Sequence, residues 1–194
     1  MATTNRSIIC EIPVFFATSE GQTRRIAGRI ASVLHDLGFD SCAIDVAGAN
    51  AANIDWTNVR GALVGASLHA GKHQKVAERF VKAHALDLTS VPSAFFSVSL
   101  SAASKNAKEV VAADKIARAF PNACGWRPAR IVTVAGRLAY REYGFFIRWV
   151  MKRIAKKEGA PTDTSRDYEL TDWAEVDALA RDMAKRVHAR VAAA

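Results

Sequence analysis

The feature that most constrains the fold is a regular alternation between apolar runs and segments of helical period. A buried strand is typically a short, nearly continuous apolar run, whereas an amphipathic helix repeats apolar residues every three or four positions. The two patterns alternate along the whole chain. They predict strands at residues 8–18, 40–47, 59–67, 92–100 and 129–136, and helices at residues 22–37, 72–85, 103–120, 142–157 and 172–191.

Strands that alternate with helices are typical of a parallel sheet joined by right-handed crossovers. The predicted strands lack a polar face, as expected when helices cover both sides of the sheet. Five such strands in 194 residues favour an α/β fold with a flavodoxin-like, doubly wound, five-stranded parallel sheet of order 2-1-3-4-5. No repeat or linker interrupts the pattern, so we predict a single domain over residues 1–194.

Composition excludes several other classes of protein. Half of the residues are apolar, which excludes disorder, and no apolar run reaches the roughly 18 residues that cross a bilayer. The three cysteines, Cys10, Cys42 and Cys124, are widely spaced and form no CxxC pair, which indicates incidental thiols in a reducing compartment. The histidines show no metal-ligand spacing, so no metal site is expected. We therefore predict a cytoplasmic protein.

The loop after the first predicted strand is the first candidate ligand site, because doubly wound sheets bind ligands beyond the carboxyl ends of their strands. It has neither a dinucleotide-binding nor a nucleotide-hydrolase glycine motif. Hydroxyls without a lysine, at a helix N-terminus, suit a terminal phosphomonoester such as that of FMN. Helix capping is the alternative interpretation. The cofactor-binding residues predicted in this loop are Thr18, Ser19, Glu20, Gly21, Gln22 and Thr23.

Two further loops follow the third and fourth predicted strands, and both are small and polar. Since the carboxyl ends of parallel strands meet at one edge of the sheet, these loops could line the two faces of a flat ring. Ordinary loop composition is the alternative for each. The cofactor-binding residues predicted here are Ser67, Leu68, His69, Ala70 and Gly71 in one loop, and Ser97, Val98, Ser99 and Leu100 in the other. No catalytic acid or base is indicated.

Several segments resemble one known family in order, from about residue 13 to about residue 187. The phosphate loop is shared by all flavodoxin-like proteins, whereas the Trp-Arg-Pro tripeptide, the AGRLAY segment and the TDT and TDW pieces are more specific. These segments read ATSEGQTRRIA, VGASLHAGKH, PSAFFSVSL, CGWRPARIVTVAG, RLAYREY and PTDTSRDYELTDW. The chain thus resembles the flavodoxin-fold, menaquinone-dependent protoporphyrinogen IX dehydrogenases of heme biosynthesis.

This resemblance implies a bound FMN that takes electrons from protoporphyrinogen IX in three two-electron steps at the flavin N5 and passes them to a membrane quinone, menaquinone or ubiquinone. It also implies an extended segment beside the flavin, at about residues 101–113. The family often carries Arg and then Tyr in the third-strand loop, where this chain has His69 and Ala70. On position alone, Arg127, Arg137 and Arg141 are candidates to pair with the substrate carboxylates.

The positive charge is concentrated in one segment. The chain has a formal net charge of +8 and a pI near 9.7. Residues 137–157 carry seven basic residues against Glu142 alone, and they interleave with aromatic residues. A basic amphipathic helix at about 142–157 is typical of an anchor on an anionic membrane surface. The alternatives are a surface helix packed on the sheet and, least favoured because no binding fold accompanies it, a nucleic-acid patch.

The sequence therefore predicts an FMN enzyme held peripherally at the inner face of the cell membrane, with no nucleic acid partner and with a homo-oligomer left open. Two other functions remain. A flavodoxin-like electron carrier or NAD(P)H:quinone reductase would use the same cofactor, although a plain carrier is usually acidic. A membrane-bound regulatory module that has lost the flavin would use none.

Overall fold

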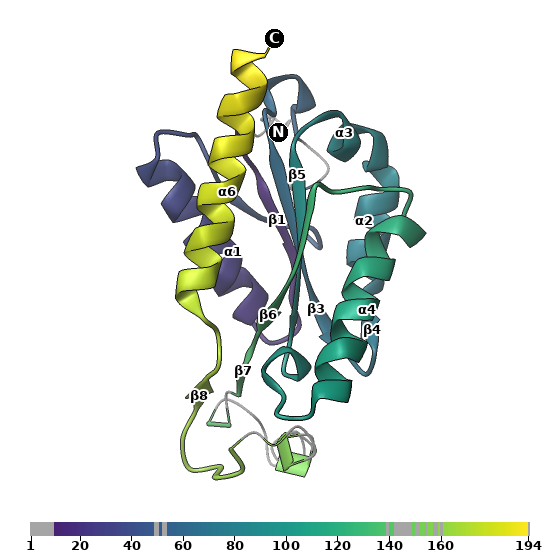
Figure 1. Ribbon diagram of the computed structural model, residues 1–194, viewed down its shortest axis with the longest axis vertical. Helices are drawn as coiled ribbons and strands as arrows, with labels where there is room; N and C mark the ends of the chain where they lie inside the picture. Colours follow the sequence, from purple (N-terminus) through teal and green to yellow (C-terminus); the bar gives the residue numbers. More distant parts are fainter. Residues whose placement is uncertain are drawn as a thin grey trace, which may run out of the picture.

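The computed structural model describes residues 10–48, 51, 54–138, 140–141, 149, 152–153, 155–156, 159 and 161–193. Among them, five parallel strands form the central sheet in the order β2-β1-β3-β5-β6 (Figure 1). Their chain order is therefore 2-1-3-4-5, and the predicted fold is confirmed. The strands are β1 (Val14–Ala17), β2 (Ala43–Asp45), β3 (Ala62–His69), β5 (Ser93–Ser99) and β6 (Arg130–Ala135).

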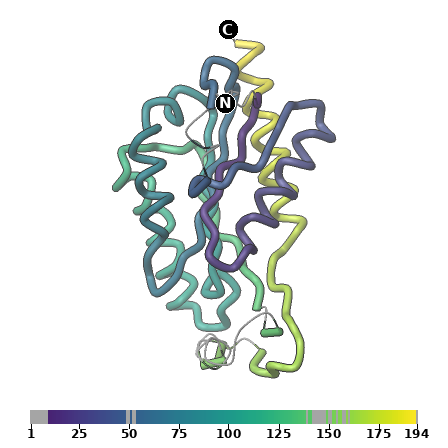
Figure 2. Tube along the Cα trace, turned by 180° about the vertical axis from the view of Figure 1, so that it is seen from behind, coloured from purple at the N-terminus to yellow at the C-terminus, as the bar shows by residue number. Residues whose placement is uncertain are grey.

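Helices cover both faces of this sheet. α1 and α6 pack together on one face, and α2, α3 and α4 cover the other (Figures 1 and 2). Two short 3-10 turns, η2 and η3, connect elements. The bounds are α1 (Gln22–Asp36), η2 (Trp56–Asn58), α2 (Lys75–Ala83), α3 (Ala85–Ser90), η3 (Ser101–Ala103), α4 (Ala107–Ala123) and α6 (Trp173–Ala192).

Two hydrophobic cores explain why the strands lack a polar face. Successive side chains of a strand point to opposite sides, so Phe16 and Phe96 pack beneath α1 and α6, while Phe15 and Phe95 pack beneath α2 and α4. Burying each of these rings stabilises the fold by about 1.5–3 kcal/mol. Trp126 of the Trp-Arg-Pro tripeptide is completely buried, and its Nε1 donates to Ser93 Oγ at 3.0 Å.

The helix predicted at residues 72–85 is partly wrong. Lys72 and His73 form a short strand, β4 (Lys72–His73), which pairs antiparallel with β3. The two residues between the strands, Ala70 and Gly71, have φ angles of 47° and 75°. Two positive φ values in succession make the tight turn that suits a β-hairpin. This turn delays the helix to Lys75, and a second short helix, α3, follows it.

A second antiparallel pair of strands lies beyond the carboxyl ends of the central strands and was not predicted. β7 (Arg137–Leu138) continues from β6 and pairs antiparallel with β8 (Tyr168–Glu169), at the lower end of Figure 1. Strands of two residues are too short to produce a periodic sequence pattern. This pairing brings the segment that precedes α6 to the edge of the sheet where ligands are expected.

The basic helix predicted at residues 142–157 lies mostly outside the described residues. Those described within that range, at 149, 152–153 and 155–156, have helical backbone. No helix in the described part of the chain is both long and apolar enough to cross a membrane. The cysteines carry free thiols: Cys10 and Cys124 are buried, and Cys42 is partly exposed.

Candidate active site

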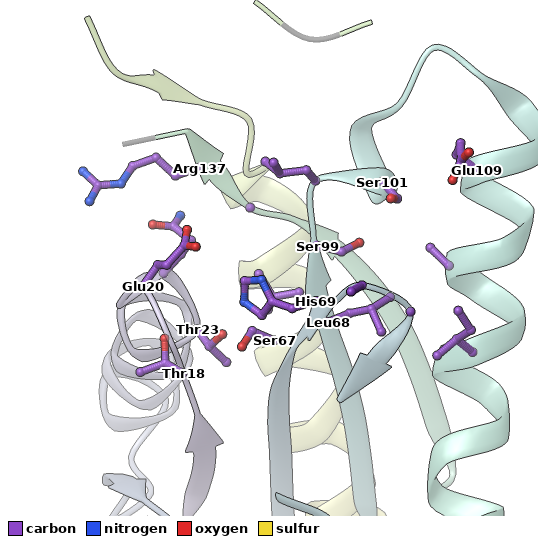
Figure 3. Close-up of a pocket in the computed structure, with 18 of the residues that line it drawn as sticks. Thr18, Glu20, Thr23, Ser67, Leu68, His69, Ser99, Ser101, Glu109 and Arg137 are labelled. Atoms are coloured by element: carbon purple, nitrogen blue, oxygen red, sulfur yellow. The ribbon is translucent and has the colours of Figure 1, made fainter. Parts of the chain in front are cut away.

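A cleft of about 440 Å³ opens at the carboxyl ends of β1, β3 and β5 (Figure 3). This volume falls within the range of roughly 300–1,000 Å³ that is usual for small-molecule sites. The cleft lies where β1 and β3 send their connections to opposite faces of the sheet, which is the topological switch point. Its lining residues are Thr18, Glu20, Gln22, Thr23, Ser67, Leu68, His69, Ala70, Gly71, Val98, Ser99, Leu100, Ser101, Glu109, Ala112, Ala113, Ile116, Gly136 and Arg137.

The loop between β1 and α1 forms one end of this cleft. Thr18 Oγ1 accepts a hydrogen bond from the backbone N–H of Gly21 at 2.9 Å, which closes the loop. Gly21 has a φ of 83°, a left-handed conformation that favours glycine. No side chain caps the N-terminus of α1. The first-turn N–H groups of α1 and the positive end of its dipole therefore favour an anion at this position.

Thr23 tests whether the loop fits a phosphate. Its Oγ1 is buried and lacks a hydrogen-bond partner in the described structure, and the residue lines the cleft. A buried hydroxyl without a partner is costly, so it marks a position where a ligand acceptor completes the site. The terminal phosphate of FMN is such an acceptor, placed at a helix N-terminus without competing side-chain caps. The residues present therefore fit FMN.

The β3–β4 hairpin forms the middle of the cleft. Its strands pair Leu68 with His73 and His69 with Lys72, so the Ala70–Gly71 turn projects beyond the sheet. A side chain at Gly71 would lie 4.0 Å from Ile116 Cδ1, which places the turn beside α4. The small residues of this turn leave the centre of the cleft open to a flat ring.

His73 and Ser97 lie behind the hairpin and do not line the cleft. The Nε2 atom of His73 and the Oγ atom of Ser97 are 2.9 Å apart and share a hydrogen bond. Burial lowers the pKa of His73 to about 4, because the apolar surroundings disfavour the charged ring. His73 is therefore neutral near pH 7. Ser97 is 1% exposed and does not line the cleft, contrary to its predicted contact with the cofactor.

Gln74 connects the first and third strand ends. In the orientation that satisfies both ends of its carboxamide, the oxygen accepts from Ser19 N at 3.1 Å and the nitrogen donates to Ala17 O at 3.1 Å. Ser19 is thus held from outside the cleft and does not line it. Neither His73 nor Gln74 was predicted to take part in the site. They follow a two-residue turn containing glycine, and recognising the hairpin would have indicated them.

The predicted cofactor residues gather at this cleft, apart from three that do not line it: Ser19, Gly21 and Ser97. Of the three candidate arginines, Arg137 alone lines the cleft. Arg127 precedes β6 at its amino end, which is the opposite end of the sheet, so it cannot reach a ligand here. Arg141 is exposed and lies outside the cleft lining, and its backbone N–H donates to Asp167 at 2.9 Å.

The opposite wall of the cleft comes mainly from α4, which overlaps the segment at about residues 101–113 that the family resemblance placed beside the flavin. Glu109, Ala112, Ala113 and Ile116 face the phosphate-binding end across the cleft, as the position of Glu109 in Figure 3 illustrates. Three of the four are small or apolar. Among the described residues, no group of three His, Cys, Asp or Glu side chains is placed to hold a metal.

A doubly wound sheet of order 2-1-3-4-5, with an uncapped, hydroxyl-lined helix N-terminus at its switch point, defines the flavodoxin-like class. Comparison with known proteins agrees, since residues 13–165 match the flavodoxin domain family. The chain belongs to this family and, within it, to the protoporphyrinogen IX dehydrogenases (quinone).

Curated relatives from Escherichia coli and Leishmania major carry that name. The Escherichia coli (strain K12) protein is 39% identical over 174 residues, which cover 88% of this chain and 93% of the relative. The Leishmania major protein is 34% identical over 173 residues, which cover 88% of this chain and 73% of the relative. Oxidised flavodoxin 1 from Bacillus cereus superposes with a TM-score of 0.55 at 19% identity, covering 90% of this chain and 97% of the flavodoxin, which shows a shared fold.

Proposed function

We propose that this chain oxidises protoporphyrinogen IX to protoporphyrin IX, the step that makes the porphyrin of heme, with a quinone as electron acceptor. The observation that carries the proposal is the 39% identity to an enzyme of that name across 88% of the chain. The family match over residues 13–165 includes the cleft, which stands at the position where the fold binds ligands. The single domain predicted over residues 1–194 accommodates the whole site.

FMN is the cofactor that we assign to the cleft. Thr18, Thr23 and the first-turn N–H groups of α1 would hold its phosphate, while the β3–β4 hairpin and the loop after β5 would flank its ring. When bound, FMN supplies two-electron redox chemistry, and a six-electron oxidation uses it three times. The chain contributes orientation, and the neutral His73 lies behind the hairpin, outside the cleft lining.

We place the substrate against the α4 side of the cleft. Ala112, Ala113 and Ile116 offer an apolar wall without large side chains, which suits a second flat ring. Arg137 lines the rim, and its side chain is 18% exposed. Its guanidinium, which lies 3.9 Å from the Asp167 carboxylate, carries the charge and the donors that suit a carboxylate. We assign Arg137 to a carboxylate of the substrate, with Arg141 close behind it in the chain.

The basic segment at about residues 142–157 is the part of the protein that we place against the membrane. Ala155 is buried with Leu138 and Tyr140, so this segment packs next to β7 and the cleft rim. Trp149 is 51% exposed, and the Arg153 guanidinium lies 5.0 Å from the centre of its ring. An exposed aromatic residue among cations favours an anionic lipid surface. We propose peripheral attachment to the inner face of the cell membrane, where menaquinone or ubiquinone is available; a homo-oligomer stays a prediction.

An anaerobic assay tests this function directly. The FMN-loaded protein is mixed with protoporphyrinogen IX and either menaquinone or ubiquinone, and porphyrin fluorescence is followed. We expect porphyrin to form only when a quinone is present, and the faster quinone identifies the acceptor. Quinone reduction with NADPH, without porphyrin formation, would contradict the proposal and favour an NAD(P)H:quinone reductase. A net charge of +8 already disfavours a plain electron carrier.

A further inference from the structure

The segment just before α6 holds the first turn of α1. Gln22, which is 7% exposed, donates from Nε2 to Glu169 Oε1 at 2.9 Å and to Thr171 Oγ1 at 2.8 Å. Although Gln22 was predicted to bind the cofactor, its amide nitrogen is committed to these two partners. Gln22 belongs to the turn whose N–H groups face the phosphate site, so these contacts fix the orientation of that turn.

Arg25 adds a second connection one turn further along α1. Its guanidinium donates to Gln22 Oε1 at 3.0 Å and to Glu169 Oε2 at 2.9 Å. It also lies 5.5 Å from the centre of the Trp173 ring. Each oxygen of the Glu169 carboxylate therefore accepts a hydrogen bond from a different α1 side chain, and Gln22 is bonded at both ends of its carboxamide.

The same segment is also fixed to the end of the central sheet. Thr171 Oγ1 donates to Ala135 O, the last residue of β6, at 2.7 Å, and Leu170 N donates to Gly136 O at 3.2 Å. In the β7–β8 ladder, Glu169 is the direct partner of Arg137. Glu169 thus holds α1 with its side chain and Arg137 with its backbone, yet it does not line the cleft.

We propose that Gln22 and Glu169 are positioning residues that couple the phosphate end of the cleft to Arg137 at its rim. This inference rests on the proposed function, because it takes FMN at α1 and a substrate carboxylate at Arg137. Losing the Glu169 side chain frees the first turn of α1 and disconnects it from the β7–β8 pair that carries Arg137, while the backbone pairing of Glu169 with Arg137 remains. One residue that touches neither ligand therefore affects the binding of both.

Glu169→Ala tests the coupling. We expect the dissociation constant for FMN to rise roughly tenfold, the order expected when hydrogen bonds to a charged group are lost. At saturating FMN, the KM for protoporphyrinogen IX should rise severalfold while kcat stays within about twofold. Glu169→Gln keeps an oxygen that can accept from Gln22 and should recover most of the FMN affinity. Glu175→Gln, at an exposed position in the first turn of α6, is the control that should change neither value.

Two measurements do not depend on turnover. The ³¹P NMR shift of bound FMN reports the phosphate environment, and fluorescence quenching gives the affinity for protoporphyrin IX. We expect Glu169→Ala to change the ³¹P shift of bound FMN and to weaken the binding of protoporphyrin IX. Weaker FMN binding with unchanged porphyrin affinity would overturn the coupling, and so would no change in either. Failure of the wild-type protein to turn over porphyrinogen would count against the proposed function instead, since both ligands can be titrated without catalysis.

Thr171→Val is a second test of the coupling, which serves if Glu169→Ala fails to fold. It replaces a hydroxyl by a methyl group of similar size, and it removes the bonds to Gln22 and to Ala135 while leaving Glu169 in place. We expect the same paired loss of FMN and porphyrin affinity. Thr171→Ser, which keeps the hydroxyl, should restore both; a loss that Ser fails to restore would overturn the assignment.

Discussion

Thr23 and His73 are two polar residues at the same end of the sheet, and their surroundings give them different roles. The Thr23 hydroxyl is buried without a partner in the described structure and lines the cleft. His73 is satisfied by Ser97 and packs against Phe120, with the two ring centres 4.6 Å apart. The Thr23 hydroxyl, which has no partner in the described structure, indicates where a ligand binds. His73, which is hydrogen-bonded to Ser97, stabilises the packing behind the hairpin.

The first prediction concerns Thr23→Val. The substitution keeps the shape of the side chain and removes the hydroxyl that the FMN phosphate would satisfy. We expect FMN affinity to fall roughly tenfold, because a hydrogen bond to a charged acceptor is lost. The free energy of unfolding of the apoprotein should stay the same or rise, since an unpaired buried hydroxyl disappears. Fluorescence titration and apoprotein melting measure the two effects. Unchanged FMN affinity would move the phosphate away from α1.

The second prediction concerns His73 and pH. Its pKa is about 4 in the folded protein against 6.5 for the free side chain, so the unfolded chain binds the proton more tightly. The free energy of unfolding should therefore be highest above pH 6.5 and decrease as the pH falls toward 4. The loss amounts to at most about 3 kcal/mol. Urea unfolding at pH 7.5 and 4.5 measures it.

The matched variants for this pH effect are His73→Gln and His35→Gln. Glutamine does not titrate, so His73→Gln should remove much of the difference in unfolding free energy between the two pH values. His35 is exposed near the end of α1, and its substitution should leave the difference as in the wild type. Equal pH profiles for the wild type and His73→Gln would show that other groups cause the acid sensitivity.

At the scale of elements, the periodic segments were predictable and the shortest ones were not. The apolar period of α1 and the continuous runs of β3 and β5 carry their own signals, so the sheet order followed from connection rules. The β3–β4 hairpin depends on Ala70 at φ 47°, and the β7–β8 pair joins residues 30 and 32 apart in the sequence. Alanine is not a typical residue for such a turn, and pairing between distant dipeptides leaves no local pattern.

The same limit explains which parts of the site were missed. Residues among the last of a strand, such as Ser67 in β3 and Val98 in β5, were found because the carboxyl ends of the strands meet at one edge. The Gln22–Glu169 contact was missed because it depends on tertiary packing. The α4 wall was indicated only by the family resemblance, through the segment at about residues 101–113. Arg127 was misplaced because the Trp-Arg-Pro tripeptide serves the core through Trp126, at the far end of β6.

The third prediction tests α4 as the substrate wall. Ala113 is 3% exposed and lines the cleft, whereas Val111 is 67% exposed on the same helix. Ala113→Leu should fill the space for the second ring, raise the KM for porphyrinogen severalfold and change FMN affinity little. Val111→Leu adds one methylene at an exposed position and should change neither. If Ala113→Leu instead blocks FMN, the flavin ring itself lies against α4.

At the scale of the whole molecule, charge and cleft lie at the same end. Arg137 lines the cleft. The exposed side chains of Lys152, Arg153 and Lys156 belong to the segment that packs beside β7. The end of this segment lies close to Lys105, since a side chain at Gly159 would lie 3.3 Å from Lys105 Cβ. An acidic, poorly soluble substrate and an anionic bilayer would approach this end of the protein. The excess charge therefore has a location as well as a sign.

The fourth prediction separates location from net charge. Changing Lys152, Arg153 and Lys156 together to Gln should weaken binding to anionic vesicles about 100-fold, at about 1 kcal/mol for each basic residue near the surface. Lys115→Gln, Lys185→Gln and Arg190→Gln combined remove the same charge from exposed positions on α4 and α6. Vesicle sedimentation compares the two. Equal losses in both triple variants would show that net charge alone attracts the protein to lipid.

The contact of Gln22 with Glu169 and Thr171 also has a consequence for the order in which the protein is made. The partners are 147 and 149 residues apart in the chain, so the turn that faces the phosphate is synthesised well before its anchors. During translation the first βα unit can form, but its orientation is fixed only after Glu169 and Thr171 have left the ribosome. We therefore expect ribosome-bound fragments that end before residue 169 to hold the flavin weakly.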